Sequence, residues 1–181
     1  MLNLEPQWVA VYTNPRAEKK VQEKFANAGF DCYLPLQRQL RKWSDRNKWV
    51  EMPLFPSYVF VKICATDVVF IRNTIGVVMI VSFGRNIAVV PEREIAAIRR
   101  ILEEDHEFVV ENSLKLVKNA RVRVLAGPFK DMEGTLVSNS KDGNFSVNIE
   151  ALSASIVMTI DRELLEFVPD NAKETSNKFH F

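Results

Sequence analysis

An acidic stretch, EEDHEFVVENS, separates two parts of the chain that have different hydrophobic patterns. Before it, periodic segments follow one another in the order strand, helix, strand, strand, helix, strand, strand, helix, which predicts an α+β domain with an antiparallel sheet. After it, short β-prone segments alternate with turn signals, which predicts a small all-β barrel. We therefore expect a domain over residues 1–104, an acidic linker over 105–119, a barrel over 120–169 and a flexible tail over 170–181.

The first helix has clear sequence signals at both ends. Asn14 and Pro15 are suited to the N-cap and the first helical position. Apolar residues then recur at helical spacing from Ala17 to Ala28, and Gly29 can adopt the left-handed conformation that ends a helix. Another helix is expected to begin after Pro91.

Side-chain alternation in two predicted strands, residues 8–12 and 57–63, separates aliphatic from aromatic residues. In both strands, the residues that point to one face are all aliphatic, and they are suited to packing beneath helices. If the two strands are neighbours, the other face of the sheet carries an aromatic cluster. Such a cluster is either covered by a helix or by the barrel, or it is exposed as a protein interface. Its members are Trp8, Tyr12, Tyr58 and Phe60, with Phe55 and Pro56 leading in.

The segment LQRQLRKWSDRNKWVEMPLF is polar and basic, with a turn signal at Ser44-Asp45, and it predicts an extended hairpin or a long loop. Cations that surround two tryptophans can neutralise phosphates and stack on bases. The alternative is a hairpin tip that is simply solvated. The residues concerned are Arg38, Arg41, Lys42, Arg46 and Lys48, around Trp43 and Trp49.

Motifs of enzymes are absent from the sequence: it has no HExxH, no Walker-type loop, no GxSxG and no glycine-rich dinucleotide turn. His106 and His180 have no cluster of further ligands in the sequence around them. Cys32 and Cys64 lie in apolar runs without CxxC spacing, which indicates buried free thiols in a reducing cytosol. We therefore expect no catalysis, no metal and no cofactor.

The formal net charge of +1 excludes a global basic field, so any contact with nucleic acid must be local. The N-terminus does not have the pattern of a secretory signal, and the longest apolar run, residues 75–83, is too short to span a bilayer. A cytoplasmic monomer without membrane contact is expected.

Three segments, WVAVYT, LFPSYVFVKI and IRNTIGV, closely resemble the N-terminal (NGN) domain of NusG-family transcription elongation factors. The segment VRVLAGPFKDMEGTLV is similar to the KOW motif of that family's SH3-like barrel. The resemblance covers residues 8–168 in the family's order. It implies a non-enzymatic factor that binds the clamp helices of the largest RNA polymerase subunit. The positions that match this surface are Trp8, Phe55, Pro56, Tyr58, Ile75 and Val77.

The resemblance also implies contact with the non-template DNA strand of the transcription bubble, through Arg72, Asn73 and Thr74. Asn and Thr side chains suit base edges, and Arg suits a phosphate or a guanine edge. The alternative is a helix end and turn in which Asn73 adopts the left-handed conformation.

In the KOW segment, Gly127 and Gly134 match turn glycines of the family and are expected to be structural. Asp131 and the segment NIEALSASIVMTI depart from the family pattern, which has a Phe-Gly loop by which general members engage Rho or a ribosomal protein. These departures resemble specialised UpxY-like or RfaH-like members. They imply operon-specific antitermination, which UpxY-like factors carry out at surface-polysaccharide operons. A general factor that couples polymerase to Rho or the ribosome is one alternative. Another is a ribosome- or RNA-binding protein that uses the KOW barrel alone.

Overall fold

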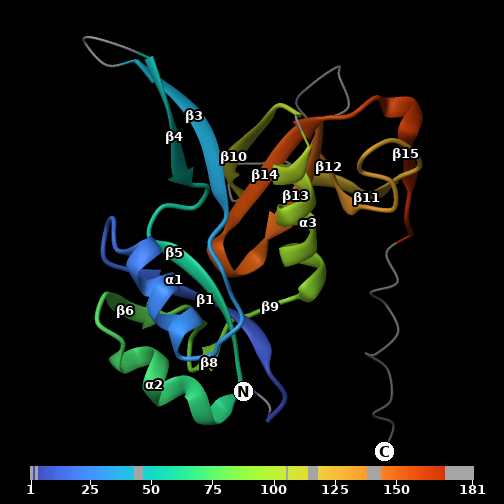
Figure 1. The fold of residues 1–181 in the computed structure, drawn as a ribbon. Helices are drawn as coiled ribbons and strands as arrows, with labels where there is room; N and C mark the ends of the chain where they lie inside the picture. Colours follow the sequence, from blue (N-terminus) through green and yellow to red (C-terminus); the bar gives the residue numbers. More distant parts are fainter. Residues whose placement is uncertain are drawn as a thin grey trace, which may run out of the picture. The chain divides into compact units, whose positions relative to one another are not determined.

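The computed structural model describes residues 2, 4–42, 47–104, 106–113, 118–137 and 144–169 (Figure 1). The chain divides into two compact units, Met1–Asp105 together with Ile149–Ala154, and His106–Asn148 together with Ser155–Phe181. The first unit combines helices with antiparallel strands and the second is rich in strands. This arrangement confirms the predicted fold class.

The main sheet of the first unit has the strand order β2-β5-β1-β6, with β9 also paired to β1. Val9 is opposite Val61 and Tyr12 is opposite Tyr58 in the register of β1 with β5, so the two strands compared in the sequence are neighbours, which is the condition for an aromatic cluster on one face. The strands are β1 (Gln7–Thr13), β2 (Cys32–Tyr33), β5 (Tyr58–Ile63), β6 (Val77–Ile80) and β9 (Val89–Val90).

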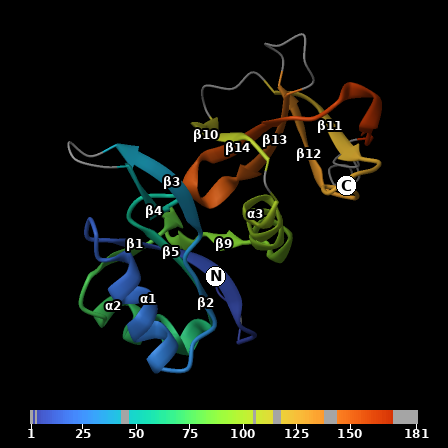
Figure 2. The same ribbon diagram turned by 45° about the horizontal axis from the view of Figure 1, so that its top comes forward.

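Three helices accompany this sheet: α1 (Glu18–Asn27), α2 (Val68–Asn73) and α3 (Glu92–Glu103). The aliphatic face of the sheet packs against α1 and α2, which lie next to one another in both views (Figures 1 and 2). This burial removes the apolar stripes of both helices from water. The aromatic side chains of β1 and β5 lie on the opposite face of the sheet. The core cluster includes Val9, Val11, Val21, Phe25, Val59, Val61 and Ile71.

The start of α1 differs from the prediction. The helix begins at Glu18, with Ala17 as its N-cap, so the predicted cap at Asn14 is wrong. Arg16 adopts a left-handed conformation with φ of 65°, which an α-helix cannot contain. Asn14 instead closes a turn, because its carbonyl accepts a hydrogen bond from the backbone N–H of Ala17 at 3.0 Å. The predicted stop at Gly29 is confirmed by its φ of 86°.

The basic segment forms a separate two-stranded hairpin of β3 (Leu36–Lys42) and β4 (Asn47–Pro53), as predicted. Both strands are seen extending together in Figure 1. A second, shorter hairpin consists of β7 (Ser82–Phe83) and β8 (Asn86–Ile87), and a 3-10 turn (Ala65–Asp67) precedes α2.

The second sheet has six strands in the order β10-β14-β13-β12-β11-β15. Its first strand, β10 (Phe108–Asn112), lies within the segment expected to be a linker. Part of that segment is therefore paired with the sheet. The other strands are β11 (Lys118–Val124), β12 (Glu133–Val137), β13 (Asn144–Ile149), β14 (Ala154–Thr159) and β15 (Leu165–Phe167). Short 3-10 turns, Glu150–Leu152 and Arg162–Leu164, lie before β14 and β15. The predicted turn at Asp142-Gly143, the tail and His180 lie outside the described residues.

Cys32 and Cys64 are both free thiols, and they are half-buried rather than fully buried. Burial raises the pKa of the Cys32 thiol, and the nearby Asp31 raises it further. Of the helices that the structure describes, none has the length and apolar character needed to cross a membrane.

Candidate functional site

A row of three side chains crosses the main sheet on the face opposite α1 and α2. Tyr58 on β5 is opposite Tyr12 on β1, and Tyr12 is opposite Met79 on β6. The two tyrosine rings are tilted, with 5.2 Å between their centroids. Both tyrosines are half-buried, whereas Met79 is 48% exposed. We call Tyr58, Tyr12 and Met79 the aromatic row; it presents a partly exposed apolar surface with hydroxyl groups.

Phe55 and Phe60 lie deeper than the aromatic row. Phe60 is fully buried and Phe55 is only 4% exposed. Their rings meet edge to face with 6.2 Å between centroids, a favourable geometry for aromatic pairs. Pro56, by contrast, is exposed. Of the predicted segment 55–58, Pro56 and Tyr58 are therefore the side chains that a partner can reach.

The loop before β5 is held by a buried carboxylate. Glu18 Oε1 accepts a hydrogen bond from the backbone N–H of Ser57 at 2.8 Å, and the Ser57 carbonyl accepts one from the backbone N–H of Thr13 at 2.8 Å. Ser57 adopts a left-handed conformation with φ of 65°, which is uncommon for a residue other than glycine. These two bonds fix the residue that precedes Tyr58.

Trp8 is 2% exposed and has partners within the first unit. Its Nε1 donates a hydrogen bond to Glu92 Oε2 at 2.9 Å. The Arg99 guanidinium and the Lys62 ammonium lie 5.8 Å and 5.9 Å from the indole centroid. This environment satisfies the buried indole N–H and places cations within cation–π range. Trp8 is a core residue beside the predicted surface.

Burial raises the pKa of two tyrosines of this face, Tyr33 and Tyr58. It raises the pKa of Tyr33 to about 12, although the nearby Arg99 guanidinium partly opposes this increase. The pKa of Tyr58 is also raised, mainly by burial and secondly by Tyr12. A neutral tyrosine hydroxyl can donate a hydrogen bond to a partner's carboxylate or carbonyl group.

The predicted rim residues differ in exposure. Ile75 is 82% exposed, while Val77 is half-buried against the core and is opposite Thr13 in the register of β6 with β1. Lys24 Nζ donates a hydrogen bond to the Ile75 carbonyl at 3.0 Å, which fixes the backbone of this turn to α1. Ile75 thus has an exposed apolar side chain on a backbone that is fixed by a hydrogen bond.

At the end of α2, Arg72 and Asn73 are exposed, whereas Thr74 is half-buried. The Thr74 hydroxyl donates a hydrogen bond to the Phe70 carbonyl at 2.9 Å, so it caps the helix. The alternative in which Asn73 supplies the left-handed residue is wrong, because that conformation falls on Gly76, with φ of 104°. Arg72 and Asn73 are the two predicted DNA-contacting side chains that face solvent.

The basic hairpin has a different residue pattern on each face. In the register of the two strands, Leu40 is opposite Trp49 and Arg38 is opposite Glu51, and these four side chains share one face. Lys48 lies on the other face. Lys42 and Lys48 are exposed. Nothing is described of the Arg41 side chain, and Trp43 and Arg46 lie outside the described residues.

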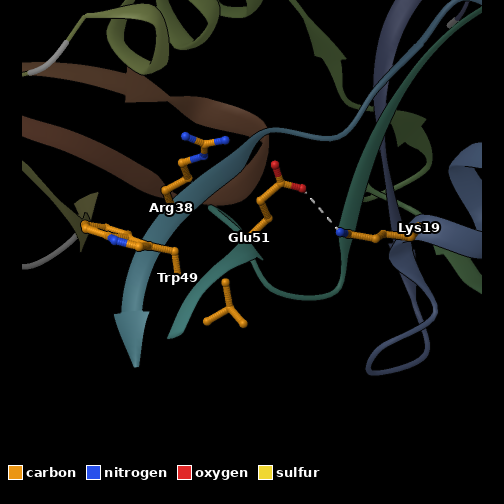
Figure 3. A pocket seen from close by; sticks show the side chains of 5 residues that line it. Lys19, Arg38, Trp49 and Glu51 are labelled. Carbon is orange, nitrogen blue, oxygen red and sulfur yellow. Dashed lines mark ion pairs between the residues drawn. The ribbon is translucent and has the colours of Figure 1, made fainter. Parts of the chain in front are cut away.

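A groove of about 600 Å³ lies at the base of this hairpin, next to α1. Figure 3 shows Arg38 and Trp49 leaving the hairpin on the same side, with Glu51 turned toward Lys19. The Lys19 ammonium lies 3.6 Å from the Glu51 carboxylate. The groove is lined by Lys19, Arg38, Trp49, Val50 and Glu51.

In the second unit, the two predicted structural glycines have different roles. Gly127 adopts a left-handed conformation with φ of 83°, as expected for a turn glycine. Gly134 lies within β12, where a Cβ atom would be 2.5 Å from the Phe145 ring and 2.5 Å from the Ser146 carbonyl oxygen. Gly134 is therefore required for space and not for a turn.

His106 has contacts that are structural in character. Its Nε2 lies 2.9 Å from the Thr159 carbonyl oxygen, and its ring meets Phe129 edge to face with 5.3 Å between centroids. Within the ranges that the structure describes, no group of three or more His, Cys, Asp or Glu side chains is placed to hold a metal ion.

Two residues of this site were missed in the sequence. Met79 belongs to the row but lies in a β-prone run whose pairing partner the sequence does not specify. Glu18 resembles any other charged residue of an amphipathic helix, and its partner is distant in the chain. Met79 is placed in the row only by the register of β6 with β1, which the sequence does not specify, and no sequence signal identifies Glu18.

These features define the class of the protein: an α+β unit with a partly exposed aromatic row and a basic hairpin, joined to a unit rich in strands. The chain belongs to the NusG family, because the family model described as transcription termination factor nusG matches residues 6–99, more than half of the chain. It is a NusG-family transcription termination/antitermination factor.

Two curated relatives have the name transcription termination/antitermination protein NusG. The protein of Halalkalibacterium halodurans is 26% identical over 149 residues, covering 74% of this chain and 82% of the relative. The protein of Rickettsia typhi is 28% identical over 149 residues, covering 76% of this chain and 77% of the relative. A solved structure of Thermotoga maritima NusG is 23% identical and covers 91% of this chain and 98% of that chain, with a TM-score of 0.48.

Proposed function

We propose that this chain is an operon-specific antitermination factor that acts as a monomer. It binds the clamp helices of the largest RNA polymerase subunit and suppresses pausing and termination, at surface-polysaccharide operons. Binding alone is sufficient for this effect, since a factor that binds the elongating conformation more tightly than the paused one shifts the equilibrium between them.

The aromatic row is the observation that supports polymerase binding most directly. Tyr58, Tyr12 and Met79 form a continuous, partly exposed strip on the sheet face that α1 and α2 do not cover. Aromatic and methionine side chains are enriched in protein interfaces, and a helical partner requires an apolar strip of this kind. Pro56 and Ile75 add exposed apolar area, whereas Trp8 and Phe55 support the surface from beneath.

Contact with the non-template DNA strand is assigned to the end of α2. Arg72 and Asn73 are both exposed there, and they can bind a phosphate and a base edge. Thr74 contributes by capping the helix that carries them. The basic hairpin is a further nucleic-acid contact in this proposal, through the exposed Lys42 and Lys48.

The specialised role is supported by the segment between β13 and β14. Ile149, Glu150 and Ala151 lead into a turn in which Ser153 adopts a left-handed conformation, with φ of 49°. This turn has neither the phenylalanine nor the glycine of the loop by which general members engage Rho or a ribosomal protein. A changed loop at this position favours a changed partner.

The test is transcription in vitro with purified polymerase on the leader of a surface-polysaccharide operon. We expect the wild-type chain to increase read-through and to shorten pauses, and Tyr58→Ala to lose most of this effect. Phe167→Ala is the matched control, because Phe167 is a large, exposed side chain that belongs to the second unit and is not a member of the row. Unchanged pausing with the wild-type protein on this leader would contradict the proposal.

General coupling of polymerase to Rho or to the ribosome is the second candidate, and the names of the curated relatives favour it. The full chain, immobilised, would then retain purified Rho or the ribosomal protein partner of general members. Retention by wild-type protein, and loss of retention when Glu150 and Ser153 are replaced, would favour this general role over the operon-specific one.

A further inference from the structure

The β3–β4 hairpin exposes two large apolar side chains next to one another. Leu40 and Trp49 are opposite each other in the register and are 53% and 65% exposed. A polar hairpin that is merely solvated does not require an exposed indole beside an exposed leucine. The pair forms a flat apolar platform on one face of the hairpin.

Cations flank this platform on the same face. Arg38 and Lys42 each lie two residues from Leu40 in β3, so their side chains share its face, and both are exposed. Arg38 also lines the groove, together with Trp49 (Figure 3). The carboxylate opposite Arg38, that of Glu51, pairs with Lys19 instead, so Arg38 has no ion pair with a carboxylate in the described part of the chain.

We infer that this face binds an unpaired stretch of nucleic acid, with one base stacked on Trp49 and the neighbouring phosphates paired with Arg38 and Lys42. Aromatic platforms alternating with cations are the usual means by which proteins hold single strands. A duplex fits this surface poorly, because its bases are already stacked on one another and cannot present a free face to the indole. The groove, about 600 Å³, lies in the size range of small-molecule sites and can hold one nucleoside.

This inference rests on the proposed function and deepens it, because that function identifies the strand. In a transcription bubble the exposed strand is DNA, so the occupant is single-stranded DNA. Trp49 also lies in β4, a different element from α2, which carries Arg72 and Asn73, so the two contacts can be tested separately.

The experiment measures binding of the full chain to a fluorescein-labelled thymidine oligonucleotide of about 12 nucleotides, a length within the usual site sizes, by fluorescence anisotropy. We expect Trp49→Ala to weaken binding roughly tenfold and Trp49→Phe to retain most of it, because stacking needs an aromatic ring. Arg38→Gln should weaken binding severalfold and reduce the steepness of the salt dependence by about 0.7, the value for one lost phosphate contact on a single strand.

Arg85→Gln is the matched control, because it removes the same charge from an exposed arginine in the turn of the shorter hairpin, between β7 and β8. It should leave binding within about twofold of wild type, since Arg85 has no place on the platform and no phosphate contact is lost with it. Circular dichroism and urea unfolding of every variant verify the fold, and these substitutions on exposed hairpins should leave both unchanged.

Several results would overturn the inference. They are unchanged binding by Trp49→Ala, equal losses in Arg38→Gln and Arg85→Gln, equally tight binding of a duplex, or binding of a uridine RNA with none of DNA. Polymerase binding is measured separately with Tyr58→Ala and Trp49→Ala. If only Tyr58→Ala loses polymerase binding, the proposed function stands whatever the oligonucleotide result. The two hypotheses therefore fail independently.

Discussion

The Glu18 carboxylate accepts a hydrogen bond from the backbone N–H of Ser57, with 2.8 Å between Oε1 and the nitrogen. Glu18 is 6% exposed, and a carboxylate at such a position is costly unless it is hydrogen-bonded. The bond joins the first turn of α1 to the loop before β5, where Ser57 has a left-handed backbone. It thereby holds Tyr58, the next residue, at its place in the aromatic row.

Replacing Glu18 by Ala should lower the free energy of unfolding by about 1–3 kcal/mol, because the Ser57 N–H is left buried without a partner. Urea unfolding followed by circular dichroism measures the change. Glu23→Ala is the control, since Glu23 is an exposed glutamate of the same helix and its loss should cost no more than about 0.5 kcal/mol. Equal effects of the two substitutions would show that the Glu18–Ser57 bond contributes nothing to stability.

Trp8→Ala should lower the free energy of unfolding by about 3–5 kcal/mol, the usual cost of emptying a buried aromatic site. Tyr58→Ala should cost less, because Tyr58 is half-buried at the surface. Thermal unfolding compares the two variants. A Trp8 variant as stable as the Tyr58 variant would indicate that Trp8 belongs to the surface and not to the core.

The raised pKa of Tyr33, about 12, predicts a loss of stability at high pH. Between the ordinary tyrosine pKa near 10 and 12, the unfolded chain has released this proton while the folded chain retains it. The unfolded state then binds fewer protons, so the free energy of unfolding falls as pH rises through this window, and it is unaffected below it.

Absorbance at 295 nm, which reports tyrosinate, checks the prediction for Tyr33. The chain has three tyrosines, and Tyr33→Phe should remove the transition at the highest pH. The variant should also lose less stability than wild type between pH 10 and 12. A wild-type titration in which all three tyrosines ionise together near pH 10 would contradict the assignment.

Much of the fold could be predicted because alternation and helical spacing are local properties of the sequence. Parity separated the aliphatic from the aromatic residues within β1 and within β5, whereas the pairing that brings the aromatic residues together comes from the structure. The extension of the row to Met79 could not be predicted, because the register of β6 changes at a bulge between Tyr12 and Thr13. Bulges depend on packing between strands, which periodicity within one strand does not record.

The errors and omissions have a similar physical cause. Asn14 and Pro15 are good helix-start residues, but the left-handed Arg16 delays the helix to Glu18. Phe55 matches the family's polymerase-binding surface in sequence, and the structure adds that its side chain is only 4% exposed. Local signals identify residue types that suit a position, whereas burial and hydrogen-bond partners depend on contacts between distant segments.

Gly134 permits a prediction about the second unit. A Cβ atom at this position would lie 2.5 Å from both the Phe145 ring and the Ser146 carbonyl oxygen. Ser146 is opposite Thr135 in the register of β12 with β13, so relief of the clash would require these two strands to separate. Gly134→Ala should therefore destabilise the second sheet by about 1–3 kcal/mol, the range for overpacked sites.

Gly127→Ala separates the effect of space from that of backbone conformation. Apart from its two chain neighbours, no atom of the described residues lies within 4 Å of a Cβ placed at Gly127, but its φ of 83° is unfavourable for alanine, at a cost of about 1–2 kcal/mol. Gly127→Asn should recover part of this cost, since Asn tolerates the left-handed region. Gly134→Asn should destabilise the second sheet more than Gly134→Ala does, because the Asn side chain is larger. Amide hydrogen exchange in β12 and β13, with β1 and β5 as the internal reference, measures each change. If Asn were tolerated better than Ala at Gly134, backbone conformation would be the reason for glycine there, and the steric explanation would be wrong.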